Sequence, residues 1–378
     1  MAMLTDVLHI IAPHLLSYFT LREALSLCCV GRAFLLLTRR HGLRYGFPLA
    51  GVLRCVTGGR EALGRTQGLA VDWRGGQVYA AATFEHRLLA LSPTPAGRLG
   101  SLRPLPLPPS HPLLYPRAMC LSPKGTRLHV TDRSGMSTVQ LEGGRAASAC
   151  RVPLEFGGAG SPSWPMGLCQ RAADGALFVA GHASHCVQGI RPDGSTWVVA
   201  GREGVSGHCD GVGAAARFSH PRGLCCIPPG GPWGNTLVLA DTGNFVLRAI
   251  ARAFWAAPLG SPSGPFPLHT THTSLLYPPP PHTQVPSGTV RTLAGGVGQW
   301  GERDGTGAAA RFASLGDVLF SHGLLYAVDV GAHAVRSITY PGGHVRTLTS
   351  QLQWPSSLGV GPMGELYVAD SEKMFKII

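Results

Sequence analysis

Short runs of apolar residues, each followed by a polar turn, recur along the chain after residue 52. The run at 237–240, for example, ends at Asp241 and is followed by a turn and a further apolar run at 245–247. Apolar runs of this length between turn residues are typical of β-strands in antiparallel sheets. Because the pattern repeats, we predict six units that each form one four-stranded sheet. The central runs of these units lie at 78–83, 128–132, 177–182, 237–244, 325–333 and 366–371.

The spacing between equivalent positions of consecutive units is 50, 49, 60, 88 and 41 residues, so one interval is too long for a single sheet. That interval contains a proline-rich tract at 252–287. Proline cannot donate to a β-ladder or continue a strand. We therefore predict that the tract is a disordered or polyproline insertion between the third and fourth strands of the fourth unit.

Two long loops, 200–218 and 294–312, are identical at twelve of nineteen aligned positions. Both end in Arg-Phe, and we expect each aromatic ring to fill the wedge between two sheets while each guanidinium bonds backbone carbonyls or a turn aspartate. The residues concerned are Arg217, Phe218, Arg311 and Phe312. Asp210 and Asp304 each precede a glycine, which favours a turn, and Asp241 can accept hydrogen bonds from the backbone of its own turn.

The sixth unit has no fourth strand of its own, whereas the stretch 51–59 carries the pattern of the other outer strands. We expect this N-terminal strand to complete the last sheet and to close the ring. The units resemble NHL repeats over residues 52–378, most clearly in the last three and least in the first, where Ala82 replaces the expected aspartate. The resemblance implies an all-β fold, a six-bladed NHL-type β-propeller.

Residues 4–40 differ from the rest of the chain, because glycine and proline are scarce and apolar residues recur at helical spacing. The stretch 15–34 resembles the central half of an F-box, although Gly31 interrupts its second helix and Phe34 stands where the family has tryptophan. The resemblance implies a small α-helical segment over 1–45 that docks the adaptor subunit of an SCF ubiquitin ligase. Its docking residues would be Leu15, Leu16, Phe19, Leu25, Val30 and Phe34. The alternative is a helical hairpin that caps one face of the propeller.

Composition and charge narrow the setting of the protein. The many turn residues, 51 glycines and 31 prolines, agree with short strands, and the net charge of +12 comes almost entirely from arginines that are scattered along the chain. The ten cysteines lack the paired spacing of a structural zinc site. Without a signal peptide or an apolar run long enough to span a bilayer, we predict a cytoplasmic or nuclear protein with no membrane partner.

The sequence favours a binding function over catalysis. Some six-bladed relatives, such as peptidyl-amidating lyases, are enzymes, but the predicted starts of the inner strands carry no histidine that could hold a metal. The histidines fall instead on turns between second and third strands, at His86, His182, His185 and His333. Asp317 is the single carboxylate that we expect to face the central channel. We predict no catalytic residue, metal or cofactor, and a metal-dependent lyase or hydrolase is the least favoured reading.

We therefore predict a protein-interaction platform, a substrate-recognition subunit of an SCF-type ligase if the F-box resemblance holds. The target would bind to the face formed by the loops 201–220 and 295–314 and the turns 241–244 and 329–333. The predicted target-binding residues are Arg202, His208, Asp210, Arg222, Asp241, Asn244, Trp300, Arg303, Asp304, Asp329 and His333. An RNA-binding or general scaffolding propeller is the alternative, and it requires arginines gathered with exposed aromatic residues on one face.

Overall fold

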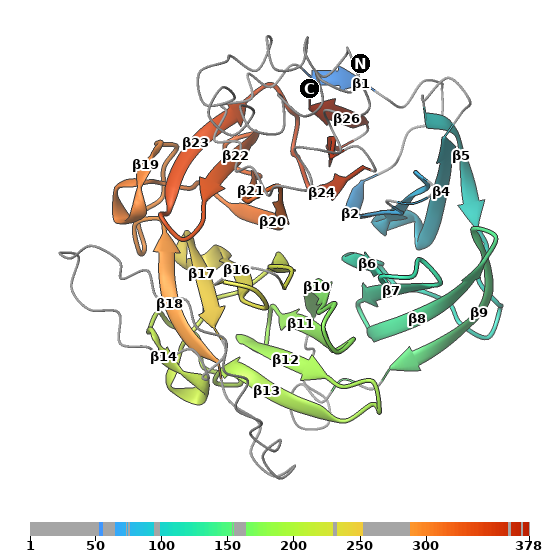
Figure 1. The fold of residues 1–378 in the computed structure, drawn as a ribbon, viewed down its shortest axis with the longest axis horizontal. Helices are drawn as coiled ribbons and strands as arrows, with labels where there is room; N and C mark the ends of the chain where they lie inside the picture. The colour runs from blue at the N-terminus through green and yellow to red at the C-terminus, as the bar shows by residue number, and fades with distance from the viewer. Residues whose placement is uncertain are drawn as a thin grey trace, which may run out of the picture.

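The structure, a computed structural model, describes residues 53–55, 65–72, 74, 76–93, 99–152, 154, 164–229, 233–251, 288–361, 364–371 and 373–377. Within these residues, six antiparallel sheets surround a central axis as the blades of a propeller (Figure 1). The predicted all-β fold with six blades is confirmed. The predicted helical segment at 1–45 and the proline-rich tract at 252–287 lie outside the described residues.

Each blade runs from an inner strand at the axis to an outer strand at the periphery (Figure 1). Blade 1 consists of β2 (Thr66–Val71), β3 (Val78–Ala82), β4 (Arg87–Pro93) and β5 (Leu99–Leu105). Blade 2 consists of β6 (Met119–Leu121), β7 (Arg127–Asp132), β8 (Gly135–Glu142) and β9 (Arg145–Val152). Blade 3 consists of β10 (Pro165–Gln170), β11 (Leu177–Gly181), β12 (Cys186–Ile190) and β13 (Thr196–Gly201).

Blades 4 and 5 carry a fifth, short strand at the outer edge, which the sequence pattern did not indicate. Blade 4 consists of β15 (Leu224–Cys226), β16 (Leu237–Asp241), β17 (Val246–Ala251), β18 (Thr289–Ala294) and the added β14 (Gly211–Val212). Blade 5 consists of β20 (Leu315–Ser321), β21 (Leu324–Asp329), β22 (Ala334–Thr339), β23 (His344–Thr349) and the added β19 (Gly305–Thr306). The added strands come from the two similar loops and pair antiparallel with β18 and β23.

Blade 6 is completed by the N-terminal strand. It consists of β24 (Ser357–Val360), β25 (Leu366–Ala369), β26 (Met374–Ile377) and β1 (Leu53–Cys55). Leu53 lies opposite Ile377 and Cys55 opposite Phe375 in an antiparallel pairing. The expected closure of the ring by the front of the chain is therefore observed, and it covers an edge of β26 that would otherwise be open.

Short 3-10 helices connect several strands. They are η1 (Thr83–Glu85), η2 (Gly213–Ala215), η3 (Thr242–Asn244) and η5 (Gly307–Ala309). The core lies between neighbouring blades, where the second strands are almost entirely buried. Phe218 is fully buried among residues of blades 3 and 4, and Phe312 among residues of blades 4 and 5. Both rings thus fill the wedges that the sequence predicted for them.

The third strand of blade 4, β17, ends at Ala251, and its fourth strand, β18, begins at Thr289. Their ladder runs from Ala251 opposite Thr289 to Leu247 opposite Ala294. Among the described residues, no helix is long and apolar enough to cross a membrane.

Candidate binding face and axial cavity

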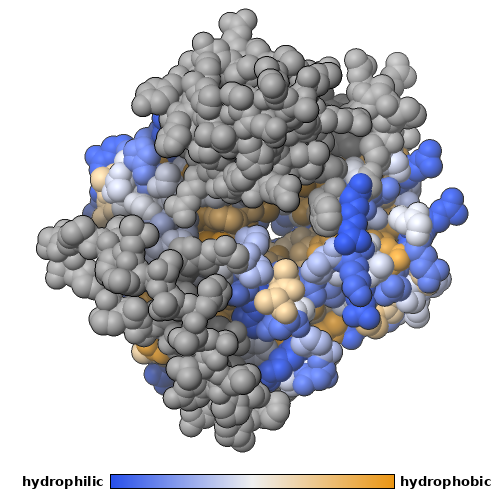
Figure 2. Space-filling model, in the orientation of Figure 1, coloured by the Kyte–Doolittle hydropathy of each residue, from blue (hydrophilic) through white to orange (hydrophobic). Residues whose placement is uncertain are grey.

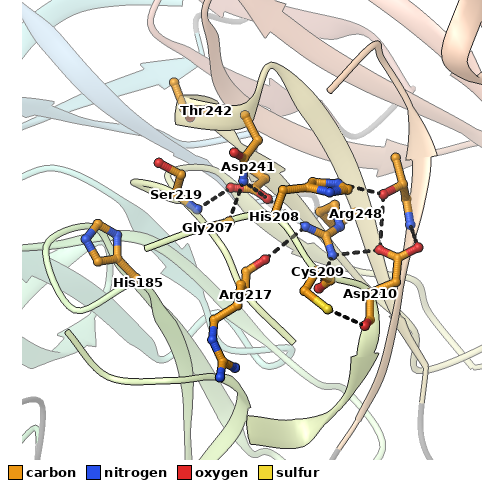
Figure 3. A network of polar contacts seen from close by, with 12 residues as sticks. His185, Gly207, His208, Cys209, Asp210, Arg217, Ser219, Asp241, Thr242 and Arg248 are labelled. Atoms are coloured by element: carbon orange, nitrogen blue, oxygen red, sulfur yellow. Dashed lines mark hydrogen bonds and ion pairs between the residues drawn. The ribbon is translucent and has the colours of Figure 1, made fainter. Parts of the chain in front are cut away.

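One end of the ring, here called the loop face, carries the loops that lead into inner strands and the turns between second and third strands. In blade 4 this face is supported by a buried ion pair (Figure 3). The guanidinium of Arg248, from β17, donates to Asp241 Oδ2 at 2.8 Å, and both side chains are fully buried. The other nitrogen of Arg248 donates to Asp210 Oδ1 at 2.7 Å and to the carbonyl of Cys209 at 2.8 Å. One arginine therefore fastens the long loop to the blade.

Asp241 makes its remaining bonds outside its own turn backbone, contrary to the prediction. Its Oδ1 accepts from the backbone N–H of Ser219, at the end of the long loop, at 2.7 Å. Its Oδ2 also accepts from the side-chain amide of Asn244 at 2.9 Å. Burial raises the pKa of Asp241 to about 6, although the bonds from Asn244, Ser219 and Arg248 all favour the carboxylate. Asp241 thus ties loop, turn and third strand together.

Blade 5 repeats the arrangement with looser geometry. Arg336, from β22, is buried and donates to Asp329 at 3.4 Å and to Asp304 at 2.8 Å. Asp329 also accepts from the backbone N–H of Ser314 at 2.8 Å, and burial raises its pKa. Both arginines were missed at the sequence level. The available signal was an arginine seven residues after the turn aspartate in each of the two units.

The two loop aspartates clamp the outer strands rather than close turns of their own. Asp210 accepts from the backbone N–H of Thr292 at 3.0 Å and from its hydroxyl at 3.1 Å. Asp304 accepts from the backbone N–H of Thr347 at 3.0 Å and from its hydroxyl at 2.9 Å. The prediction of turn chemistry at Asp210 and Asp304 is therefore corrected. The carboxylates hold β14 and β19 against the blades.

The other part of the prediction for these loops, that the arginine before each buried phenylalanine bonds carbonyls, is confirmed. Arg217 donates to the carbonyls of Ala214 and Ala216, and Arg311 makes the equivalent bonds to Ala308 and Ala310. In Figure 3 the side chain of Arg217 points away from the network, while its carbonyl accepts from Arg248 at 3.1 Å.

On the loop face, three histidines link blades 1 and 2, blades 3 and 4, and blades 5 and 6. His86, His185 and His333 each have a left-handed backbone. Their Nδ1 atoms accept the backbone N–H of an aromatic residue that leads into the next blade. The pairs are His86 with Tyr115 at 3.0 Å, His185 with His220 at 3.1 Å, and His333 with Trp354 at 3.2 Å. The rings of each pair also meet edge to face, with centroids 4.3, 4.6 and 4.9 Å apart.

The three aromatic residues bonded in this way each begin a tetrapeptide that recurs in the chain. It consists of an aromatic residue, proline, a variable residue and a small residue. It occurs at 115–118, 164–167, 220–223 and 354–357, and its first residue always has a positive φ. The small position is required by close approach of the blades, because a Cβ on Gly223 would lie 2.5 Å from the carbonyl oxygen of Gly316 in blade 5. The aromatic residues are thereby placed around the axis by a rigid backbone.

A cavity of about 390 Å³ opens at the axis on this side of the ring. Its walls combine apolar side chains of the inner strands with arginines and with aromatic residues at its mouth. The lining residues include Arg65, Gln67, Phe84, Met166, Arg222, Asp317, Trp354 and Ser357. In the space-filling view along the axis, hydrophobic residues gather toward the centre of the ring (Figure 2). The recurrent tetrapeptide was the sequence signal for this cavity, and it was missed.

Arginines lie over aromatic residues at two places on the loop face. Arg65 lies over Phe84 with 5.5 Å to the ring centroid, and Arg117 lies over Trp164 at 5.9 Å. Phe84 is 52% exposed and Trp354 is 62% exposed, which is unusual for rings of this size. The loop face thus presents aromatic surface and positive charge together.

Asp317 lines the cavity, as the sequence predicted, but its Oδ1 accepts from the N–H of Val318 in its own strand and its Oδ2 is bonded to blade 6. Its Oδ2 accepts from the hydroxyl of Ser357 at 2.8 Å and from the backbone N–H of Leu358 at 2.9 Å. The Ser357 hydroxyl in turn accepts from the N–H of Leu69 at 3.0 Å. Burial raises the pKa of Asp317, against the effect of these bonds. Blades 5, 6 and 1 are joined through this chain of contacts.

The predicted target-binding residues divide into three groups. Asp241, Asn244 and Asp329 are buried within the blades, so they support the loop face without being part of its contact surface. Asp210, Asp304, His208, Arg303 and His333 are engaged in bonds that shape the loops. Trp300 and Arg202 are exposed on the long loops, while Arg222 lines the axial cavity.

Chemically reactive groups are sparse in the described part of the chain. It contains no group of three histidine, cysteine or acidic side chains placed to hold a metal ion. The thiols on the inner strands are protonated at neutral pH, because burial raises the pKa of Cys120, Cys169 and Cys225. A buried thiol of this kind is a poor nucleophile.

Comparison with known protein families and with curated proteins finds no match. Solved structures do resemble the chain. A Bacteroides thetaiotaomicron protein of unknown function matches with a TM-score of 0.60 at 12% identity, over 86% of this chain and 75% of the other. An auxiliary nutrient binding protein of the same organism matches with a TM-score of 0.58 at 13% identity, over 84% and 69%. A streptogramin B lyase matches with a TM-score of 0.51 at 12% identity, over 88% and 99%. These likenesses establish the propeller fold and do not choose between binding and catalysis.

Proposed function

We propose that the protein is a non-catalytic recognition platform that binds a protein target on its loop face. The observation that carries the proposal is the exposed aromatic and arginine surface at the mouth of the axial cavity, with Phe84, Trp354 and the stacked Arg65 at its rim. Aromatic residues and arginines are the side chains that most often dominate the binding energy of protein interfaces. The backbone N–H of Trp354 donates to His333 Nδ1 at 3.2 Å, which restrains this part of the surface and lowers the entropy cost of binding.

In its finer form, the proposal assigns the propeller to the NHL type and the segment 1–45 to an F-box. The chain would then be a substrate-recognition subunit of an SCF-type ubiquitin ligase, with the partner enzymes performing ubiquitin transfer. The support is the sequence resemblance, in particular the apolar helical faces that contain Leu16, Phe19 and Val30. A cytoplasmic or nuclear location belongs to the same proposal.

Binding of the adaptor tests the finer form directly. Purified SCF adaptor subunit should bind the full chain and fail to bind a variant that lacks residues 1–45, which retains β1 and the closed ring. Equal thermal stability of the two chains would show that the deletion leaves the propeller intact. Adaptor binding that survives the deletion would exclude an F-box in this segment.

The loop face is tested by comparing what the full chain and its variants capture from cell extract, with captured proteins quantified by mass spectrometry. Partners should be lost from a Phe84→Ala/Trp354→Ala variant. They should be retained by Val198→Ala, which removes an exposed apolar side chain from the outer strand β13. Equal loss from both variants, or from neither, would contradict a binding site at the mouth of the cavity.

Single-stranded RNA is the second candidate ligand, because arginines stacked on aromatic rings can also bind bases and phosphates. The pairs Arg65 with Phe84 and Arg117 with Trp164 favour it. RNA binding would weaken steeply as salt increases, since counterions are released from the phosphates. Affinity for an oligouridine strand, measured at two salt concentrations, checks this candidate.

A further inference from the structure

Arg222 is an arginine inside the axial cavity that has no anionic partner. It follows Pro221 in the recurrent tetrapeptide, and its backbone N–H donates to the carbonyl of Ala240 at 2.9 Å, which fixes its position. Its side chain is partly buried and lines the cavity. Among the described residues, no hydrogen bond or ion pair is made by its guanidinium, and burial alone lowers its pKa.

The three arginines that are buried among the described residues are differently placed. Arg248 and Arg336 each contact two carboxylates, and Arg171 is paired with Asp174. A partly buried guanidinium without such a partner loses part of its hydration and gains no opposite charge in return. The free energy lost at Arg222 would be recovered when a ligand supplies the missing negative charge.

Positive charge accumulates around Arg222. Burial together with Arg222 and Arg133 lowers the pKa of Arg117, and burial together with Arg222 and His220 lowers the pKa of His182 to about 4. The carboxylate of Asp317, which also lines the cavity, is held by donors from blade 6 and makes no ion pair with Arg222. This part of the cavity therefore attracts an anion.

The shape of the cavity favours a side chain over a nucleic-acid strand. A volume of about 390 Å³ lies at the lower end of ordinary ligand pockets, and Met119, Met166 and Leu168 line it together with Arg222. A single-stranded nucleic acid is bound along an open basic groove that follows its phosphates. Here Arg222 lines a cavity at the axis of the ring together with apolar residues of the inner strands.

We propose that the axial cavity is a carboxylate-binding site, in which an aspartate or glutamate side chain of a bound protein segment pairs with Arg222. Apolar residues beside that acid would contact Phe84 and Trp354 at the mouth. A planar guanidinium suits a carboxylate, because it can donate two parallel hydrogen bonds to it. This inference rests on the proposed function, and it names the chemistry of the target at that same face.

The test uses the full chain and a phage-displayed library of random peptides. Selected peptides should share an acidic residue beside apolar ones. A synthetic copy of a selected peptide should bind at least roughly tenfold more weakly when its acid is replaced by the matching amide. The unaltered peptide should lose the same affinity when it is tested against Arg222→Gln. Arg346→Gln, on the exposed side of the outer strand β23, is the matched control and should bind as the unchanged chain does.

Each other outcome overturns the inference in a recognisable way. Peptides that depend on Trp354 but not on Arg222 would leave the proposed function standing and remove the carboxylate site. Oligouridine that binds in an Arg222-dependent manner, with no peptide enriched, would replace the acidic peptide with RNA. Enrichment of neither would exclude the site. If Arg222→Gln does not fold, which thermal melting would reveal, Gln67→Leu and Arg222→Lys probe the same cavity.

Discussion

Removing Arg248 should expose how much of the loop face depends on a single buried cation. In an Arg248→Met variant, Asp241 stays buried but loses a partner at 2.8 Å, and the long loop loses its bond from Arg248 to Asp210. Deleting one member of a buried ion pair costs about 3–5 kcal/mol, because the remaining charge is left without compensation. The side chain of methionine fills the volume without replacing the charge. We therefore expect the free energy of unfolding to fall by about 4 kcal/mol at pH 8.

The loss should shrink as the pH falls. Burial already raises the pKa of Asp241 to about 6 with Arg248 present, and removing the arginine withdraws an effect that lowers it. The raised pKa means that the folded variant takes up a proton more readily than the unfolded chain, so acidification stabilises it relative to the unchanged protein. At pH 5.5, where Asp241 is protonated in the variant, the defect should be clearly smaller than at pH 8.

Urea denaturation followed by tryptophan fluorescence measures these differences. A double variant, Arg248→Met/Asp241→Asn, should recover part of the loss, because no buried charge remains. Arg336→Met should cost less than Arg248→Met, since its distance to Asp329 is 3.4 Å. The exposed Arg346→Met serves as the control. A loss below about 1 kcal/mol for Arg248→Met, or a double variant that is less stable than the single one, would refute the reasoning.

Three further predictions concern the frame of the ring, each measured as a free energy of unfolding in urea. Gly167→Ala should destabilise the protein by more than about 2 kcal/mol, because its Cβ would overlap the carbonyl oxygen of Arg222, whereas Gly194→Ala, with open space around it, should cost about 1 kcal/mol. Ser357→Ala should cost about 1–3 kcal/mol, since the Leu69 N–H loses its partner and Asp317 Oδ2 loses one of its two hydrogen bonds. Burial lowers the pKa of His129 from 6.5 to about 4, so the unfolded chain binds a proton at a higher pH than the folded protein does. The free energy of unfolding should therefore fall by about 3 kcal/mol as the pH is lowered from 6.5 to 4. This loss should be absent from His129→Gln.

The fold could be predicted from the sequence because each blade of a propeller repeats the same pattern of buried strands and polar turns. Each unit shows a buried second strand that ends at a polar turn, as at Asp241 and Asp329, and the spacing of the units gave the blade number. The closure of the ring by residues 53–55 was predictable, because the sixth unit lacks a fourth strand and the front of the chain carries the pattern of one. Hydrophobic patterning specifies these features locally, so they need no knowledge of the tertiary structure.

The site was predictable only in part, because its chemistry depends on contacts between residues far apart in the sequence. Asp210 and Arg248 are 38 residues apart, and nothing in the period of the strands indicates that they meet. The turn residues Asp241 and Asn244 were predicted to contact a target, but both are buried and support the loops instead. Arg222 was predicted on the target-binding face, but the sequence did not indicate that it lines the axial cavity.

The arginines of the loop face differ in whether a carboxylate of the chain contacts the guanidinium. Where a carboxylate from the chain meets the guanidinium, at Arg248 and Arg336, charge is neutralised inside the protein and serves rigidity. Where none does, at Arg222, the same kind of group is held by an equally rigid backbone and has its charge left over for a ligand. If the axial cavity binds a carboxylate as proposed, selectivity at the loop face would come from a ligand that fits the cavity and brings the missing negative charge with it.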